Sequence, residues 1–390
     1  MKNFFCSSKL PILSSVFLRK LCDKHTIVLQ QGAPLSKFHT GTSSFLTARS
    51  KPSVANKMKP TLESLETIRR GAGIPMQEVI GLFPFFMQNL DAVMFDCDGV
   101  LWMGNNPISG AQDLVKKLRT IGKKVFFLTN NSTKTREEFL EKFNSLGFEA
   151  TLDEIVGTSY LTALYLKEQN FKGKVYVIGT TGITRELENV GIESLPIGPD
   201  PMPADMHTWV SSLIPIPYLD PEVKAVVVGF DHHLSFTKMI KAASYLRNPN
   251  CLFVATNTDE RFPSGPEIVM PGTGSIVNAV KTAAEREPYV MGKPSPMPFE
   301  FVKRTHDLDP KKVLMIGDRS NTDILFGKDC GLWTLLVFSG VTTYREIETW
   351  KVSGNAYEKK LIPDFCLNGV ENLLALINKH GEVVHNANDN

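Results

Sequence analysis

The chain has 390 residues, 42% of them hydrophobic, and its 43 basic and 41 acidic side chains leave a formal charge of +2 at pH 7. A chain of this length and composition can bury one large core or two domain-sized ones. The near-neutral charge implies no nucleic-acid partner, and no apolar run is long enough to span a bilayer, so we expect no membrane partner either.

Residues 1–59 differ in composition from the rest of the chain. They are rich in Ser, Lys and Arg, Asp23 is their only acid, and an amphipathic patch lies within residues 10–24. A basic, Ser-rich and acid-poor N-terminus is typical of a mitochondrial transit peptide. The alternatives are a disordered tail, or an upstream extension if translation begins at Met58. We therefore expect a cytoplasmic or mitochondrial protein.

The first informative element is the apolar run 92–95, which opens onto Asp96, Cys97, Asp98 and Gly99. A short apolar run predicts a buried strand, and ligands bind at the carboxyl ends of strands in open α/β sheets. Two acids there repel each other unless a cation neutralises them, and Mg²⁺ is the simplest candidate. Taken alone, the run is also compatible with an Asp-Gly turn.

Cys97 lies between these two acids. Flanking carboxylates should raise the pKa of a thiol, so we interpret Cys97 as an inert side chain and not as a nucleophile. The six cysteines of the chain show no metal-ligand spacing, which suits a reducing compartment.

Three further apolar runs end in polar groups in the same way. Residues 125–128 lead into Thr129, Asn130, Asn131 and Ser132; residues 289–291 lead into Gly292, Lys293 and Pro294; and residues 313–316 lead into Gly317, Asp318 and the stretch 319–323. Each run opens onto hydroxyl, amide, ammonium or carboxylate groups. Four such runs in succession indicate one polar site at the edge of a sheet.

The segment between the second and third of these runs alternates strands with helices. Strands are predicted over 174–178, 224–228 and 251–255, and helices over 183–189, 236–246 and 274–285. This alternation predicts a second α/β layer structure. The Pro-rich stretch 197–221 is predicted to be a surface excursion without a motif.

The four runs, in this order, resemble the motifs of the haloacid dehalogenase superfamily of phosphohydrolases. Phe95–Trp102 and Leu128–Ser132 are most similar to its 4-nitrophenylphosphatase branch, which includes phosphoglycolate and pyridoxal phosphatases. The resemblance extends over roughly residues 86 to 375. It implies a Rossmann-like doubly wound parallel-sheet core formed by residues 60–171 and 287–390, with a large α/β cap inserted at 172–286.

The resemblance also implies catalytic roles. Asp96 would be the nucleophile that forms an aspartyl-phosphate, and Asp98 the general acid and later the base. Lys293 would keep Asp96 ionised and contact the phosphoryl group, while Thr129 and Asn130 would donate hydrogen bonds to it. The alternatives for single residues are a helix cap at Asp98, a cap or turn at Thr129 and Asn130, and a surface turn at Lys293.

By the same resemblance, Mg²⁺ would be held by the carboxylates of Asp96 and Asp318 and by the backbone carbonyl of Asp98. Asp323 would hold a metal-bound water or orient the lysine. The sequence departs from the pattern at Asn321, where many close relatives have an acid, and this change would weaken metal binding if that acid tunes affinity.

A large cap would admit only a small phosphorylated metabolite to the site. Arg261 lies in the stretch 257–263, which we expect to face the site, and could clamp a substrate carboxylate. That favours 2-phosphoglycolate; the alternative is an Arg261 paired with Glu260. Pyridoxal 5′-phosphate is the runner-up, because the histidine that pyridoxal phosphatases place near Phe262 is absent.

Two other classes remain open. A non-catalytic phosphate-ligand sensor would keep the fold but lose catalytic residues, and all of them are present here. A phosphotransferase or mutase would share Asp96 and Asp98 but protect the intermediate from water. Since capped relatives often pair through the cap, we also expect a homodimer.

Overall fold

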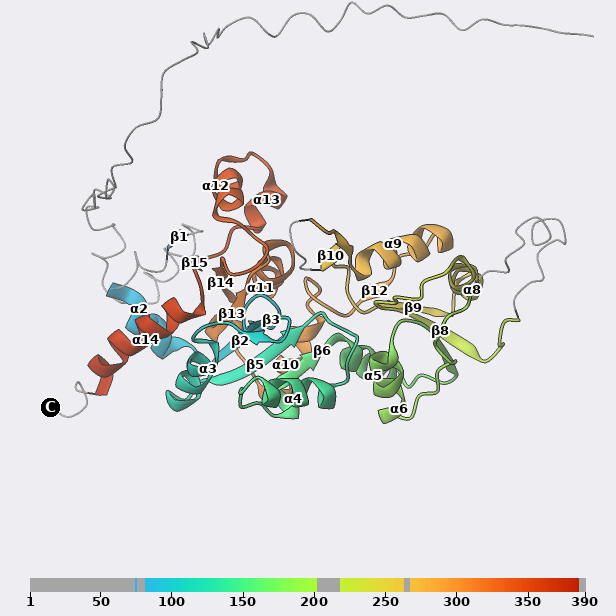
Figure 1. The fold of residues 1–390 in the computed structure, drawn as a ribbon, viewed down its shortest axis with the longest axis horizontal. Helices are drawn as coiled ribbons and strands as arrows, with labels where there is room; N and C mark the ends of the chain where they lie inside the picture. Colours follow the sequence, from blue (N-terminus) through green and yellow to red (C-terminus); the bar gives the residue numbers. More distant parts are fainter. Residues whose placement is uncertain (1–73, 76–80, 202–217, 263–266, 386–390) are drawn as a thin grey trace, which may run out of the picture. The chain divides into compact units, whose positions relative to one another are not determined.

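Parallel strands form both large sheets of this chain (Figure 1). The computed structural model describes residues 74–75, 81–201, 218–262 and 267–385. The predicted extension at 1–59 lies outside these residues, as do most of the positions 60–80 and the middle of the Pro-rich stretch. Within the described residues, no helix has the length and hydropathy needed to cross a membrane.

The larger sheet has seven strands among the described residues, all parallel. Their spatial order is β1 (Ile74–Pro75), β15 (Phe365–Leu367), β14 (Trp333–Val337), β13 (Val313–Gly317), β2 (Ala92–Asp96), β5 (Lys124–Thr129) and β6 (Ile155–Gly157). From β2 the chain proceeds to β5 and β6 on one side, and it later returns to β13 on the other side. The boundary between β2 and β13 is therefore a topological switch point, where open α/β sheets bind ligands.

The strands of this sheet are buried on both faces, which explains why they appear in the sequence as continuous apolar runs. In β2, Val93 and Phe95 belong to one core, while Ala92 and Met94 belong to another. Full burial of a side chain such as Phe95 stabilises the fold by about 1.5–3 kcal/mol. The predicted doubly wound α/β core is confirmed.

Helices cover both faces of this sheet. The core that contains Phe95 is closed by α2 (Phe83–Asn89), α3 (Ala111–Thr120), α4 (Arg136–Ser145) and α14 (Val370–His385). The core that contains Met94 is closed by α5 (Thr158–Glu168), α6 (Thr181–Asn189), α10 (Met297–His306) and α11 (Leu325–Asp329). Two further helices, α12 (Tyr344–Val352) and α13 (Ala356–Lys360), follow β14.

The inserted segment forms the second sheet, and we call this segment the cap. Its four parallel strands have the order β12 (Tyr289–Val290), β9 (Leu252–Ala255), β8 (Val223–Val228) and β7 (Lys174–Ile178). Helices α6, α8 (Phe236–Leu246) and α9 (Thr273–Ala284) lie between them in the chain, and each begins or ends within two residues of its predicted bounds. Strand β12 pairs with β9, so this sheet continues beyond residue 286.

Two short antiparallel hairpins bring further side chains to the carboxyl edge of the larger sheet. The hairpin of β3 (Trp102–Met103) and β4 (Asn106–Pro107) follows Asp98. The hairpin of β10 (Arg261–Phe262) and β11 (Met270–Pro271) belongs to the cap. Residues from both hairpins line the same cleft.

Candidate active site

Acidic side chains from two neighbouring strands meet at the switch point. Asp96 is the last residue of β2, and Asp318 directly follows β13, whose Ile316 pairs with Phe95 of β2. Oxygen atoms of Asp96, Asp318 and Asp323 lie within 4.8 Å of one another. They line a cleft of about 260 Å³ to which Asp98, Thr129, Asn130, Lys293 and Arg261 also contribute. The structure thus brings all the residues predicted for the site together.

Lys293 lies between two of the acids of this site, Asp96 and Asp323. Its Nζ lies 2.6 Å from Oδ1 of Asp96 and 2.8 Å from Oδ1 of Asp323, and it donates to the backbone carbonyl of Leu128 at 3.1 Å. Burial lowers the pKa of Lys293, but Asp323 and Asp96 more than offset this effect and the pKa is raised. The lysine is therefore a fixed positive charge against two carboxylates.

The nucleophile candidate Asp96 is less easily ionised. Burial raises its pKa well above the ordinary value, Lys293 acts in the opposite direction, and the charges of Asp323 and Asp318 raise it further. One lysine does not neutralise three buried acids. A second cation among them would favour the ionised form.

Asn130 is tied to the lysine's own backbone. Its Oδ1 accepts from the N–H of Lys293 at 2.9 Å, and its Nδ2 donates to the Lys293 carbonyl at 2.9 Å and to Oδ1 of Asp259 at 3.0 Å. Both amide hydrogens thus have acceptors, so the predicted donation from this side chain to a phosphate is not available in the present arrangement. The amide positions Lys293 instead, and the backbone N–H of Asn130 is the group that keeps the predicted role.

Thr129 is placed as a donor toward the cleft. It ends β5, is almost fully buried, and its Oγ1 accepts from the N–H of Asn131 at 3.1 Å. A hydroxyl that accepts one hydrogen bond still has its own proton to donate. The predicted phosphate-donor role of Thr129 is compatible with this geometry.

Asp98 is the most exposed of the site acids. Its Oδ1 accepts from Nε1 of Trp102 at 2.9 Å and lies 3.9 Å from Nζ of Lys142, which in turn sits 4.4 Å from the centroid of the Trp102 ring. Its carboxylate, with 37% of the side chain exposed, is separate from the buried acid cluster. The two carboxylates of the Asp-Cys-Asp run therefore occupy unlike environments, as separate catalytic roles require.

Asp318 is enclosed by backbone. Its Oδ2 accepts from the N–H of Val341 at 2.8 Å, and a Cβ added at Gly99 would lie 2.7 Å from that oxygen. Gly99 also has a φ of 91°, which favours glycine. Burial raises the pKa of Asp318 to about 7, and the charge of Asp323 adds to this shift.

Both oxygens of Asp323 already have partners. Oδ1 forms an ion pair with Nζ of Lys293 at 2.8 Å, and Oδ2 accepts from the N–H of Arg319 at 3.1 Å. The remaining acids, Asp96 and Asp318, are hard oxygen ligands whose pKa values are raised by burial first and by the charges of neighbouring acids second. These residues fit a divalent cation such as Mg²⁺.

Arg261 reaches the cleft from the cap, on strand β10, and is exposed. The predicted alternative pairs it with Glu260. Among the described residues, Glu260 is instead bound by Arg319 and by Nδ2 of Asn321, the latter at 3.2 Å. The carboxylate of Glu260 is therefore occupied by core residues, and Arg261 lines the cleft without it.

Three site residues received no role from the sequence. Asp259 is half-buried, lines the cleft and contacts Asn130, while Trp102 and Lys142 surround Asp98. Burial raises the pKa of Asp259, and the hydrogen bond from Asn130 opposes that shift. Asp259 follows the apolar run of β9 as the other site residues follow their strands, and this signal could have identified it.

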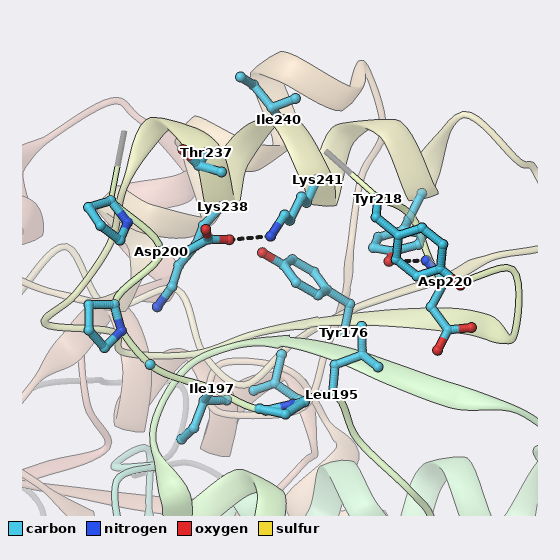
Figure 2. Close-up of a pocket in the computed structure, with 16 residues that line it drawn as sticks. Tyr176, Leu195, Ile197, Asp200, Tyr218, Asp220, Thr237, Lys238, Ile240 and Lys241 are labelled. Atoms are coloured by element: carbon cyan, nitrogen blue, oxygen red, sulfur yellow. Dashed lines mark hydrogen bonds and ion pairs between the residues drawn. The ribbon is translucent and has the colours of Figure 1, made fainter. Parts of the chain in front are cut away.

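A second pocket, of about 680 Å³, lies within the cap (Figure 2). Its Lys241 points at Asp200, 2.5 Å away, and its Lys238 pairs with the buried Asp231 at 2.6 Å. Pro201 and Tyr218, which line it, are the last described residues on either side of 202–217. Because both lysines are already neutralised, we place phosphate chemistry in the first cleft.

Comparisons with known proteins point to one family of hydrolases. A family model of haloacid dehalogenase-like hydrolases matches residues 93–193, and a second, HAD-hydrolase-like model matches 290–364. Human glycerol-3-phosphate phosphatase is 41% identical over 298 residues, which cover 74% of this chain and 91% of that protein. The two matched regions together contain the catalytic acids predicted for the cleft and its lysine.

Two solved structures extend the likeness to the fold. The p-nitrophenyl phosphatase from Archaeoglobus fulgidus has a TM-score of 0.61 and 30% identity, covering 73% of this chain and 98% of that chain. A glycerol phosphate phosphatase from Mycobacterium tuberculosis, solved in complex with magnesium, has a TM-score of 0.58 and 26% identity, covering 74% and 77%.

Proposed function

This chain belongs to the haloacid dehalogenase-like hydrolase family, and we propose that it is a Mg²⁺-dependent phosphomonoesterase that works through an aspartyl-phosphate on Asp96. The observation that carries the proposal is the convergence of Asp96, Lys293, Asp318 and Asp323 in one cleft at the switch point. Phosphoryl transfer requires a positioned nucleophile, neutralised phosphoryl oxygens and a proton for the leaving group. The cleft holds side chains for each of these tasks.

In the first half-reaction, a carboxylate oxygen of Asp96 forms a bond to phosphorus while the bond to the ester oxygen breaks. Lys293 holds Oδ1 of Asp96 at 2.6 Å and so restricts the orientation of the carboxylate. Asp98, in its protonated form, donates a proton to the departing ester oxygen, which leaves as an alcohol.

In the second half-reaction, Asp98 accepts a proton from a water molecule that attacks phosphorus. The bond between phosphorus and Asp96 breaks, and inorganic phosphate leaves with Asp96 as a carboxylate again. Trp102 holds the Asp98 carboxylate at 2.9 Å and thereby positions it for both transfers. The Asp98 side chain is more exposed than that of Asp96, so Asp98 is the acid that can contact the attacking water.

Mg²⁺ would be held by the carboxylates of Asp96 and Asp318 and by the backbone carbonyl of Asp98. When bound, the ion neutralises negative charge on the phosphoryl oxygens and on the acids. Asp323 orients Lys293, because one of its oxygens forms an ion pair with the lysine and the other accepts from the N–H of Arg319. The mycobacterial glycerol phosphate phosphatase, which was solved in complex with magnesium, supports Mg²⁺ as the ion.

The cap selects a small substrate. We propose that it comprises residues 172–286 together with β12, and that the core comprises the described residues on either side. Arg261 projects from the cap into a cleft of about 260 Å³, which favours phosphate esters of two or three carbons that bear a carboxylate or hydroxyls. The arginine favours 2-phosphoglycolate, and the relative named glycerol-3-phosphate phosphatase supports glycerol 3-phosphate.

Pyridoxal 5′-phosphate is a second candidate, favoured by one observation. Phe262 lines the cleft and packs edge-on against Phe230, with ring centroids 4.8 Å apart. An aromatic substrate ring would find an aromatic contact there. The sequence has no histidine near Phe262, where the pyridoxal phosphatases that it resembles have one, and this weighs against the candidate.

The test is phosphate release by the full-length chain from 2-phosphoglycolate, glycerol 3-phosphate, pyridoxal 5′-phosphate and 4-nitrophenyl phosphate. Each ester is assayed with Mg²⁺ and with excess chelator, and substrates are ranked by kcat/KM. Release that requires Mg²⁺ supports the phosphomonoesterase, and the ranking names its substrate class. A phosphoenzyme that persists in water would point to a transferase, and no release from any ester would favour a ligand sensor.

A further inference from the structure

The cap loop that carries Arg261 is fastened to the core beside the metal-site acids. We propose that Arg319 and Asn321 of the core form, with Glu260 of the cap, a latch that positions Arg261 over the cleft. The inference rests on the proposed function for its substrate readout. It makes Arg319 and Asn321 positioning residues for substrate selection.

The contacts of the latch form a closed triangle. A guanidinium nitrogen of Arg319 pairs with the Glu260 carboxylate, and its Nε donates to Oδ1 of Asn321 at 2.9 Å. Nδ2 of Asn321 donates back to Oε1 of Glu260 at 3.2 Å. Asn321 therefore accepts from the core arginine and donates to the cap acid at the same time, which an amide can do and a carboxylate cannot.

The latch acts on the residue that faces the substrate. Nη1 of Arg319 donates to the backbone carbonyl of Arg261 at 3.3 Å, so the same guanidinium holds both Glu260 and the next residue of the loop. The backbone N–H of Arg319 donates to Asp323, which pairs with Lys293. Arg319 therefore contacts both the cap loop and the acid cluster.

The loop has a second attachment and a rigid support. Oδ1 of Asp259 accepts from Asn130, and the carbonyls of Asp259 and Glu260 accept at 2.8 Å from the N–H groups of Gly274 and Gly272, where α9 begins. A Cβ on Gly272 would overlap the Asp259 carbonyl. Because helix α9 supports the loop from behind, the core contacts at Glu260 set how far the loop reaches over the cleft.

In this arrangement the amide of Asn321 links the core to the cap. An aspartate there would place a negative charge against Glu260 and lose the donor that binds it. Asn321 is thus matched to the acid at 260. The latch therefore assigns the departure from the family pattern to the cap–core contact.

The experiment is a charge-swap series in the full-length chain: Asn321→Asp, Glu260→Gln, and the double variant. We expect Asn321→Asp to raise KM roughly threefold to tenfold for the preferred ester of the two- and three-carbon panel. Its effect on 4-nitrophenyl phosphate, which has neither a carboxylate nor a hydroxyl for Arg261, should be much smaller. The double variant should restore KM, because the amide introduced at position 260 can donate to the carboxylate introduced at position 321. Glu287→Gln is the matched control, because Glu287 is an exposed acid between α9 and β12 that pairs with Lys281.

Hydrogen exchange provides a readout that needs no turnover. Amides of residues 257–262 and 272–274 should exchange faster in Asn321→Asp and return to wild-type rates in the double variant. Unchanged exchange in Asn321→Asp, no recovery in the double variant, or a change confined to the Mg²⁺ requirement would each overturn the latch. If the wild type releases no phosphate but exchange follows this pattern, the proposed function fails and the latch stands.

Discussion

The ammonium nitrogen of Lys293 lies 2.6 Å from a carboxylate oxygen of Asp96, and only 2% of the lysine side chain is exposed. The two residues are 197 positions apart in the chain, and they meet because Lys293, which follows β12 of the cap sheet, reaches the carboxyl end of β2. Removing one partner of a buried ion pair leaves an uncompensated charge, at a cost of about 3–5 kcal/mol. Lys293 therefore supports both the proposed chemistry and the fold.

Replacing Lys293 by Met should lower kcat at least about 100-fold and also lower the melting temperature, because Asp96 and Asp323 lose their counter-ion. Phosphate release at saturating substrate and thermal denaturation measure the two effects. Lys241→Met is the matched control, since Lys241 is a paired lysine in the second pocket. A Lys293→Met enzyme with near-normal kcat would exclude the proposed role of the lysine.

Asp96→Asn should reduce turnover at least about 10³-fold with Mg²⁺ present, because an amide cannot form the acyl phosphate. The neighbouring Cys97→Ala serves as control. Burial and the two flanking acids raise the pKa of Cys97 well above its ordinary value, so its thiol is not expected to react. Full activity in Asp96→Asn, or equal losses in both variants, would rule out the aspartyl-phosphate on Asp96.

Stability without metal should fall as pH rises. The pKa of Asp318 is about 7 in the folded chain against an ordinary value of 3.8, so between these values the folded state binds more protons than the unfolded state. The free energy of unfolding therefore decreases from about pH 4 to pH 7. Mg²⁺ needs the ionised acids, so it should raise the melting temperature more at about pH 8 than at about pH 5.5. Melting curves with Mg²⁺ and with chelator at both pH values test this; an equal or larger effect at the lower pH would contradict it.

The expected homodimer has a candidate surface on the cap. Helices α8 and α9 border an open groove whose lining includes Met239, Ile240 and Phe236, and half of the Phe236 side chain is exposed. If two chains pair here, Phe236→Asp should convert a dimer into a monomer in light-scattering measurements. A wild type that is monomeric at micromolar concentration would remove the basis for this expectation.

The sequence predicted the fold and the composition of the cleft for one physical reason. Strands that are buried on both faces appear as apolar runs, and the first polar residues after them must lie at the carboxyl edge. That argument places Asp96, Thr129 and Asp318 without any knowledge of the loops. It does not place Lys293, because β12, the strand before it, belongs to the cap sheet and is not fully buried. It also placed the cap strands within about one residue of the observed bounds.

Contacts made by loops could not be predicted in the same way. The side chain of Asn130 is bound by the backbone of Lys293, 163 positions away, and Glu260 is bound by Asn321, 61 positions away. Neither pairing leaves a periodic pattern, because each depends on how two irregular segments approach one another in three dimensions. The sequence therefore identified Asn130 and Asn321 as site residues but not their partners.

Arg261 offers the sharpest test of substrate choice. Since Glu260 is held by the core, the Arg261 guanidinium lines the cleft and can meet a substrate group beyond the phosphate. Arg261→Ala should raise KM for 2-phosphoglycolate about tenfold or more, because a charge-assisted hydrogen bond contributes roughly 1.5–3 kcal/mol. KM for 4-nitrophenyl phosphate should change little, and Arg261→Lys should recover only part of the loss, because lysine cannot bind a carboxylate bidentately. Equal changes in KM for 2-phosphoglycolate and 4-nitrophenyl phosphate would show that Arg261 contacts the phosphate or supports the loop. A larger change in KM for glycerol 3-phosphate than for 2-phosphoglycolate would indicate that the preferred substrate is an alcohol and not an acid.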